Sequence, residues 1–116
     1  MTDYDDINVP EGLALPLTEI SHEVERQREL WGEQNHPSNT GYKIYGQLAD
    51  SNKAINEGRV EKDTLTWDGI LLEEVYEALA ERDPAKLYVE LKQVAAVAAT
   101  WMECLRRNNP EVKFDG

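Results

Sequence analysis

Cysteine and long apolar runs are nearly absent from this sequence. Cys104 is the only cysteine among the 116 residues, so no intrachain disulfide can form and nothing indicates an oxidising compartment. No signal peptide and no apolar segment of membrane-spanning length is evident. We therefore expect a cytoplasmic protein without a membrane partner.

Basic side chains are also few. The chain carries 12 Lys and Arg residues against 23 Asp and Glu residues, which gives a formal net charge of −11. Such a surface disfavours sequence-independent binding to nucleic acid or to an anionic membrane. A phosphate-bearing ligand would need a metal ion to shield its charge from these carboxylates.

Strand patterns, internal repeats and low-complexity segments beyond the acidic start are missing too, whereas apolar residues recur at intervals of three and four. This spacing predicts an all-α fold of four helices near residues 18–31, 42–57, 66–82 and 84–107, with the last two antiparallel. The length suits one domain. We expect an acidic N-terminal arm (1–17), a helical domain (18–107) and a C-terminal tail (108–116).

Turn and capping residues set the predicted helix ends. Thr18 is a candidate N-cap for the first helix, and Gly32 ends it. Gly58 is expected to end the second helix. Thr66 is a candidate N-cap for the third, and the pair Asp83-Pro84 separates the third helix from the fourth, since proline is favourable at the first helical position.

The predicted helix 84–107 is apolar on more than one face. Its main stripe includes Leu87, Leu91 and Val94, while Val89 and Val97 lie outside that stripe. A helix that is apolar nearly all round is normally buried on both sides. In so small a chain we expect a second copy of the protein to cover the other apolar face of this helix. This predicts a homo-oligomer, either a dimer or a tetramer.

Two acidic clusters lie on the last two predicted helices. Glu74 and Glu77 are about 60° apart on one helix, and Glu90 and Gln93 are about 60° apart on the next. In an antiparallel hairpin that turns at Asp83-Pro84, Glu77 and Glu90 each lie roughly 9 Å from the corner. The two clusters therefore fall at the same level and can face each other.

These carboxylates have an ordinary explanation and a functional one. Acidic residues at helical spacing usually form a solvated face. Here, however, Glu74 and Glu90 lie on the shoulder of the apolar stripes, where buried carboxylates repel one another unless a cation neutralises them. Oxygen ligands converging from facing helices suit a hard divalent cation such as Mg²⁺. Gln93 would supply a neutral carbonyl oxygen to the same site.

The full pattern resembles a known family. Glu74-x-x-Glu77, twelve intervening residues and Glu90-x-x-Gln93 resemble the ExxE…ExxD signature of the all-α nucleoside triphosphate pyrophosphohydrolases, the MazG and dimeric dUTPase superfamily. The amino-acid sequence is most similar to a bacterial and bacteriophage branch of MazG-like proteins. The resemblance covers roughly residues 18 to 107, and it is carried by residues 25–28, 31–37, 67–78 and 90–98.

The resemblance implies a MazG-like helical bundle that oligomerises, depends on Mg²⁺, with Mn²⁺ as the alternative ion, and cleaves a nucleoside triphosphate to monophosphate and pyrophosphate. Glu74, Glu77 and Glu90 match its metal ligands, and Gln93 stands where the signature has aspartate. Glu73, rotated about 100° from Glu74, is a candidate to orient or deprotonate the attacking water; the alternative is a solvent-facing glutamate. Because Gln93 lacks a charge, a nucleotide-sequestering module with weak or no turnover is the alternative function, and a purely structural oligomer is a third.

The loop 32–41 (GEQNHPSNTG) is long for a connector and carries two interpretations. The superfamily places base-recognising residues in its first helix and the loop that follows. By this resemblance an aromatic ring and nearby polar side chains would form a base pocket, namely Trp31, Asn35, His36 and Asn39. The other interpretation is that His36 merely caps a helix end. Candidates for contacting the phosphates are Arg28, Lys53 and Arg59, each of which is otherwise a surface charge.

Overall fold

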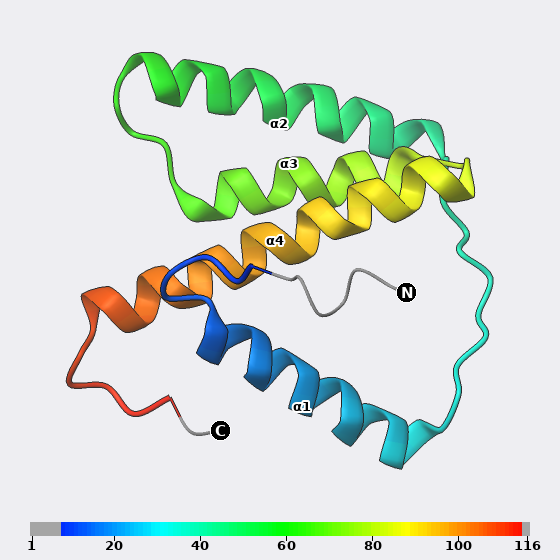
Figure 1. Ribbon diagram of the computed structural model, residues 1–116. Helices are drawn as coiled ribbons and strands as arrows, with labels where there is room; N and C mark the ends of the chain where they lie inside the picture. The colour runs from blue at the N-terminus through cyan, green and yellow to red at the C-terminus, as the bar shows by residue number, and fades with distance from the viewer. Residues whose placement is uncertain (1–7, 115–116) are drawn as a thin grey trace. The chain divides into compact units, whose positions relative to one another are not determined.

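The computed structural model describes residues 8–114. This part of the chain contains four helices and no strand: α1 (Ala14–Trp31), α2 (Lys43–Glu61), α3 (Trp67–Ala80) and α4 (Pro84–Asn108) (Figure 1). The predicted all-α fold with four helices is thereby confirmed. None of the helices within residues 8–114 combines the length and apolarity that crossing a bilayer requires.

Several predicted helix ends are confirmed. The N–H of Gly32 bonds to Arg28 O at 2.8 Å and closes α1, with Gly32 at a φ of 68°. Thr66 occupies the N-cap position of α3 with an extended backbone. At the start of α4, Asp83 Oδ2 accepts a hydrogen bond of 3.0 Å from the N–H of Lys86, as an aspartate before a first-turn proline is expected to do.

Two predicted ends are wrong. Helix α1 begins at Ala14, and Thr18 lies inside it, where its hydroxyl donates to Ala14 O. Pro16, which lies in the predicted N-terminal arm, falls in the first turn of α1, where helix N–H groups have no intrahelical acceptor and proline therefore costs little. Helix α2 passes through Gly58 to Glu61, because one glycine inside a helix costs only about 1 kcal/mol.

The chain forms two compact units. The terminal unit comprises Met1–His36 and Met102–Gly116, and the central unit comprises Pro37–Trp101. In the terminal unit, α1 is tied to the end of α4 by an ion pair between Glu19 and Arg106. The guanidinium of Arg106 also lies 5.2 Å from the centre of the Phe114 ring, a cation–π contact that fastens the C-terminal segment.

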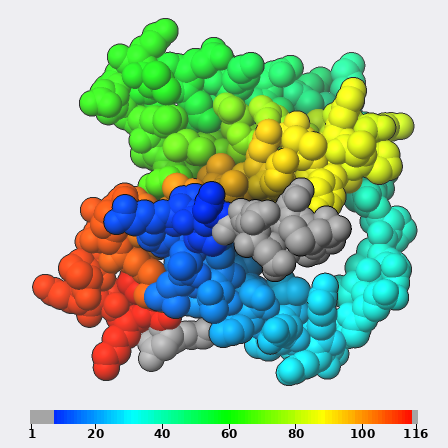
Figure 2. Space-filling model, in the orientation of Figure 1, coloured from blue at the N-terminus to red at the C-terminus, as the bar shows by residue number. Residues whose placement is uncertain are grey.

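In the central unit, α2 and α3 run antiparallel, side by side (Figure 1), and the space-filling view shows the two helices in contact (Figure 2). Ala49 on α2 is buried and lies on the same face as Asn52 and Asn56, one and two turns before them. Two asparagines on α2 fix its register, because the side-chain amides of Asn52 and Asn56 both donate to Gly69 O, at 2.8 and 2.9 Å.

Helices α3 and α4 form the predicted antiparallel hairpin (Figure 1). Trp67 and Trp101, which lie equally far in sequence from Pro84, stack with ring centroids 6.0 Å apart and planes inclined by 8°. This pairing places residues equidistant from the turn at the same level. The loop before α2 is joined to the end of α3 by the N–H of Gly41, which donates to Leu79 O at 2.8 Å.

Gly69 is expected to tolerate no side chain. A Cβ at this position would lie 2.3 Å from Asn56 Oδ1, so in Gly69→Ala either the buried Asn56 side chain or the helix must shift, which should cost about 1–3 kcal/mol. The matched change Gly46→Ala meets no atom within 4 Å, and it should stabilise α2 by about 0.5–1 kcal/mol through helix propensity. Urea unfolding of the two variants measures both effects, and equal stability of the two would contradict this packing.

Candidate metal centre

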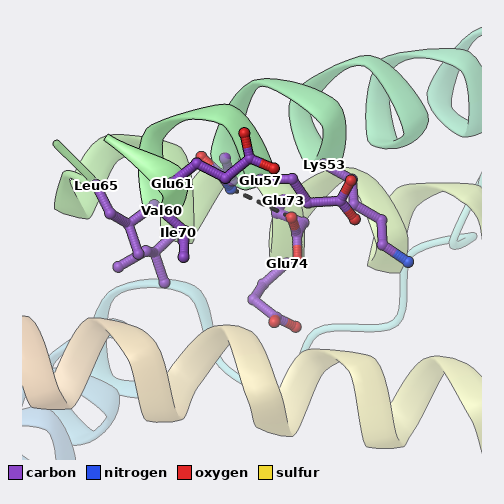
Figure 3. Close-up of a pocket in the computed structure, with 9 residues that line it drawn as sticks. Lys53, Glu57, Val60, Glu61, Leu65, Ile70, Glu73 and Glu74 are labelled. Atoms are coloured by element: carbon purple, nitrogen blue, oxygen red, sulfur yellow. Dashed lines mark hydrogen bonds between the residues drawn. The ribbon is translucent and has the colours of Figure 1, made fainter. Parts of the chain in front are cut away.

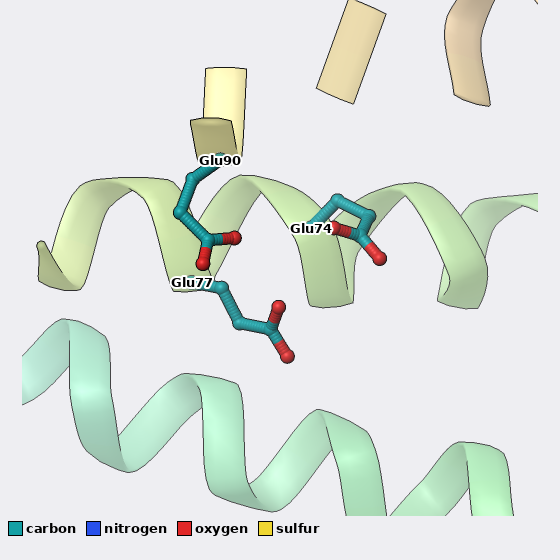
Figure 4. A group of neighbouring side chains, drawn as sticks. All are labelled: Glu74, Glu77 and Glu90. Atoms are coloured by element: carbon teal, nitrogen blue, oxygen red, sulfur yellow. The ribbon is translucent and has the colours of Figure 1, made fainter. Parts of the chain in front are cut away.

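Three carboxylates converge in the central unit. Glu74 and Glu77 project from one face of α3, and Glu90 reaches them from α4 (Figure 4). One oxygen from each lies within 4.8 Å of the other two. All three side chains are half-buried. The hairpin therefore brings together the three acidic residues that helical spacing had indicated.

The cluster stores electrostatic repulsion. Burial raises the pKa of Glu74 above its ordinary value, and the charges of Glu90 and Glu73 raise it further. Burial likewise raises the pKa of Glu77, together with the charges of Glu74, Glu73 and Glu90, while Lys53 opposes the shift. A divalent cation among these oxygens would replace repulsion by attraction.

Gln93 lies beside the cluster on α4, one turn after Glu90. With its amide turned so that the nitrogen faces the carboxylates, it donates to Glu74 Oε2 at 3.2 Å and to Glu90 Oε2 at 3.1 Å. The opposite orientation would set its carbonyl oxygen against two carboxylate oxygens, which is favourable only when a cation lies between them. The Gln93 side chain is thus long enough to act as a fourth ligand. Without a cation, its amide nitrogen donates hydrogen bonds to the carboxylates.

The donor set fits a hard cation. Three carboxylates and an amide oxygen are the ligand types that Mg²⁺ and Mn²⁺ take from proteins, usually with water completing the coordination. Lys53 on α2 is close enough to lower the pKa of Glu77. Of the predicted substrate-binding residues, Lys53 is therefore the one that the structure places at the acidic cluster, where its ammonium can meet a phosphate.

A groove between α2 and α3 adjoins the cluster. It has a volume of about 530 Å³ and shares Glu74 with the acidic cluster. Val60, Leu65 and Ile70 gather at one end, whereas Lys53, Glu57 and Glu73 lie toward the other (Figure 3). Glu73, the predicted water-orienting residue, accepts a hydrogen bond from Asn56 Nδ2 at 3.2 Å and is half-buried, so it is not simply a solvent-facing glutamate.

The predicted base-pocket residues bond within their own loop. The Trp31 side chain is 71% exposed at the end of α1. Asn35 donates to Glu33, His36 lies 3.2 Å from Gln34 Oε1, and Asn39 accepts from the Tyr42 hydroxyl at 2.9 Å. The remaining candidate, Arg28, lines a smaller cavity of about 260 Å³ between the end of α1 and Gln34. Except for Asn39, these residues belong to the terminal unit, and the base pocket stays a prediction.

Asn56, which lines the groove, and Asn52, one turn before it and outside the groove lining, are the α2 residues that sequence reasoning missed. The sequence did carry an indication of their role. Two asparagines one turn apart are poor helix formers, which indicates that their side chains bind a group outside the helix. That group is the carbonyl of Gly69 on α3. The spacing could not identify it, since the rotation of α2 about its axis is set by packing.

Relieving the repulsion should stabilise the metal-free protein. The pKa of Glu74 is raised in the folded state, so wild-type stability falls as the pH rises from the ordinary Glu range through this raised value. Glu74→Gln removes the charge and should raise the free energy of unfolding at pH 7 by ~0.5 kcal/mol. Thermal melts in EDTA from pH 7 to pH 4 check this: the gain should shrink as wild-type Glu74 becomes protonated, and a gain independent of pH would contradict it.

Comparisons of the chain with known protein families, with curated proteins and with solved structures found no match in any of the three.

Proposed function

We propose that this protein is a Mg²⁺-dependent nucleoside triphosphate pyrophosphohydrolase, which converts a triphosphate to monophosphate and pyrophosphate in the control of nucleotide pools. One observation carries the proposal: Glu74, Glu77 and Glu90 converge from two helices with their oxygens within 4.8 Å of one another. These are the residues on which the resemblance to the MazG and dimeric dUTPase superfamily rests. Mn²⁺ has the same ligand preferences and is expected to substitute.

The residues around the cluster suit this chemistry. When bound, the metal ion neutralises charge on the triphosphate and makes a coordinated water more acidic. Glu74, Glu77 and Glu90 would hold that ion, and Lys53 on α2, whose charge acts on Glu77, offers a positive charge for a phosphate oxygen. Glu73 points into the adjoining groove (Figure 3), from which its carboxylate can accept a proton from water attacking the α-phosphorus.

Gln93 favours a second candidate function. Its amide nitrogen satisfies Glu74 and Glu90 without any cation, and as a ligand it would bring no charge. A module that binds and sequesters nucleotides, with little or no turnover, would retain the groove and a weak metal site. It differs from the first proposal only in the rate of the chemical step.

A nucleotide panel separates these functions. Pyrophosphate release is measured over canonical and modified triphosphates with and without Mg²⁺, and thermal shift is recorded for the same set. The proposed enzyme releases pyrophosphate only with Mg²⁺. The sequestering module shows a Mg²⁺-dependent thermal shift without release, and a chain that shows neither effect is a structural helical protein.

We also propose that the protein assembles as a homo-oligomer. Large apolar side chains on α4 face solvent in the single chain: Tyr88 is 74% exposed, Leu91 52% and Val89 41%. The buried apolar side chains of α2, α3 and α4 are all alanines, namely Ala49, Ala78 and Ala99. A second copy would cover this face of α4. Light scattering at micromolar concentration should give at least twice the chain mass of 13.2 kDa, and a monomer would contradict the assembly.

A further inference from the structure

Asn56 is the buried polar side chain at the centre of the α2–α3 packing. It is 7% exposed, and its Nδ2 donates to Gly69 O at 2.9 Å and to Glu73 Oε1 at 3.2 Å. An amide nitrogen carries two protons, so both are used. The two acceptors also fix the orientation of the amide, because its oxygen could not replace the nitrogen against a carbonyl and a carboxylate.

The second of these bonds acts on Glu73 from the neighbouring helix. Gly69 and Glu73 are one turn apart on α3 and share the face that meets α2. Asn56 spans both, since α3 has no side chain at Gly69 to keep α2 away: a Cβ there would lie 2.3 Å from Asn56 Oδ1. Glu73 is thus directed into the groove, while Glu74, the next residue, projects from α3 toward α4 (Figure 3) and belongs to the acidic cluster.

The choice of asparagine carries a cost. Among the residues that the structure describes, Asn56 Oδ1 is a buried oxygen without a hydrogen-bond partner, which lowers stability. An apolar side chain of similar size would avoid this loss. Asn52 already donates to the Gly69 carbonyl at 2.8 Å, so the link between the helices does not require Asn56. What an apolar residue could not supply is the hydrogen bond to Glu73.

We propose that Asn56 is a positioning residue that holds the Glu73 carboxylate in the orientation it needs to receive a proton from the attacking water. This inference rests on the proposed pyrophosphohydrolase function and assigns Glu73 its supporting contact. Asn56 is not one of the three cluster residues, and in this role it acts on the reaction through Glu73. Its loss should therefore slow the chemical step and leave binding intact.

Asn52 provides a matched control, because it lies one turn from Asn56 on the same helix and donates to the same carbonyl but has no bond to Glu73. Asn56→Ala should lower kcat about tenfold, with KM and the Mg²⁺ affinity from isothermal titration within about twofold of wild type. Asn52→Ala should lower the melting temperature comparably and leave kcat within about twofold. In a Glu73→Gln background, Asn56→Ala should change kcat less than about twofold.

Each outcome decides the matter. Equal kcat for Asn56→Ala and Asn52→Ala, or an unchanged loss in the Glu73→Gln background, shows that Asn56 only supports the fold and overturns the inference while the proposed function stands. A wild type that hydrolyses no nucleotide with Mg²⁺ overturns both together. If Asn56→Ala does not melt cooperatively, Asn56→Ser replaces it, and failure of both variants to fold assigns Asn56 to structure alone.

Discussion

Replacing Glu77 by alanine is expected to abolish Mg²⁺-dependent hydrolysis, with a fall of about 100-fold or more in kcat/KM. The same loss is expected for Glu74→Ala and Glu90→Ala. Each change removes one of three charges that offset the lost hydration of the cation, and α2, α3 and α4 supply no fourth carboxylate within the convergent cluster. Pyrophosphate release with a Mg²⁺ titration measures the activity, and the Mg²⁺-induced rise in melting temperature measures binding independently.

A control on the same helix separates ligation from general charge effects. Glu103 lies on α4, outside the cluster, and pairs with Arg107 at 3.1 Å. Glu103→Ala removes the same charge and should leave the Mg²⁺-dependent thermal shift within error of wild type. If neither Glu74→Ala nor Glu90→Ala alters metal or nucleotide binding, the acidic cluster is an ordinary solvated helix face and the proposed function is wrong.

The helix ends were predictable from the sequence where neighbouring residues, rather than tertiary packing, determine them. Asp83-Pro84 set both the turn and its cap, and the symmetry of the hairpin about that turn placed Glu77 and Glu90 at one level. Prediction failed where the local signal is weak. Gly58 costs α2 only about 1 kcal/mol, and the helix continues for three more residues to Glu61. Pro16 suits a first turn as well as it suits a loop.

The site was predictable only along the two helices that share a sequence-encoded turn. Glu74, Glu77, Glu90 and Gln93 follow from 3.6-residue periodicity and one hairpin. The contribution of α2 does not, because its loop of five residues after Glu61 leaves its rotation free until Asn52 and Asn56 meet Gly69. The groove and the support of Glu73 are therefore properties of tertiary packing.

Adding a charge at Gln93 is expected to tighten Mg²⁺ binding about tenfold, because the site then has a fourth carboxylate. The amide already lies 3.1–3.2 Å from the Glu74 and Glu90 carboxylates, so Gln93→Glu keeps its reach. Gln93→Asp introduces the aspartate of the ExxD signature that this sequence resembles, on a side chain one methylene shorter. Without metal, both changes replace a donor by a like charge and should lower the melting temperature. Mg²⁺ should reverse that loss, and isothermal titration with parallel melts measures both effects.

Gln93→Ala and Gln47→Glu complete the series. Alanine removes one oxygen and no charge, so activity should fall modestly and return at higher Mg²⁺. Gln47→Glu adds the same charge on an exposed position of α2 and should leave Mg²⁺ affinity unchanged. The kinetics then decide between the two functions. If the protein is an enzyme, the wild type is active, and Gln93→Glu or Gln93→Asp lowers the Mg²⁺ concentration that its activity requires. A sequestering module is nearly inactive as wild type and gains hydrolysis in those variants, because the missing charge is what holds back the chemical step.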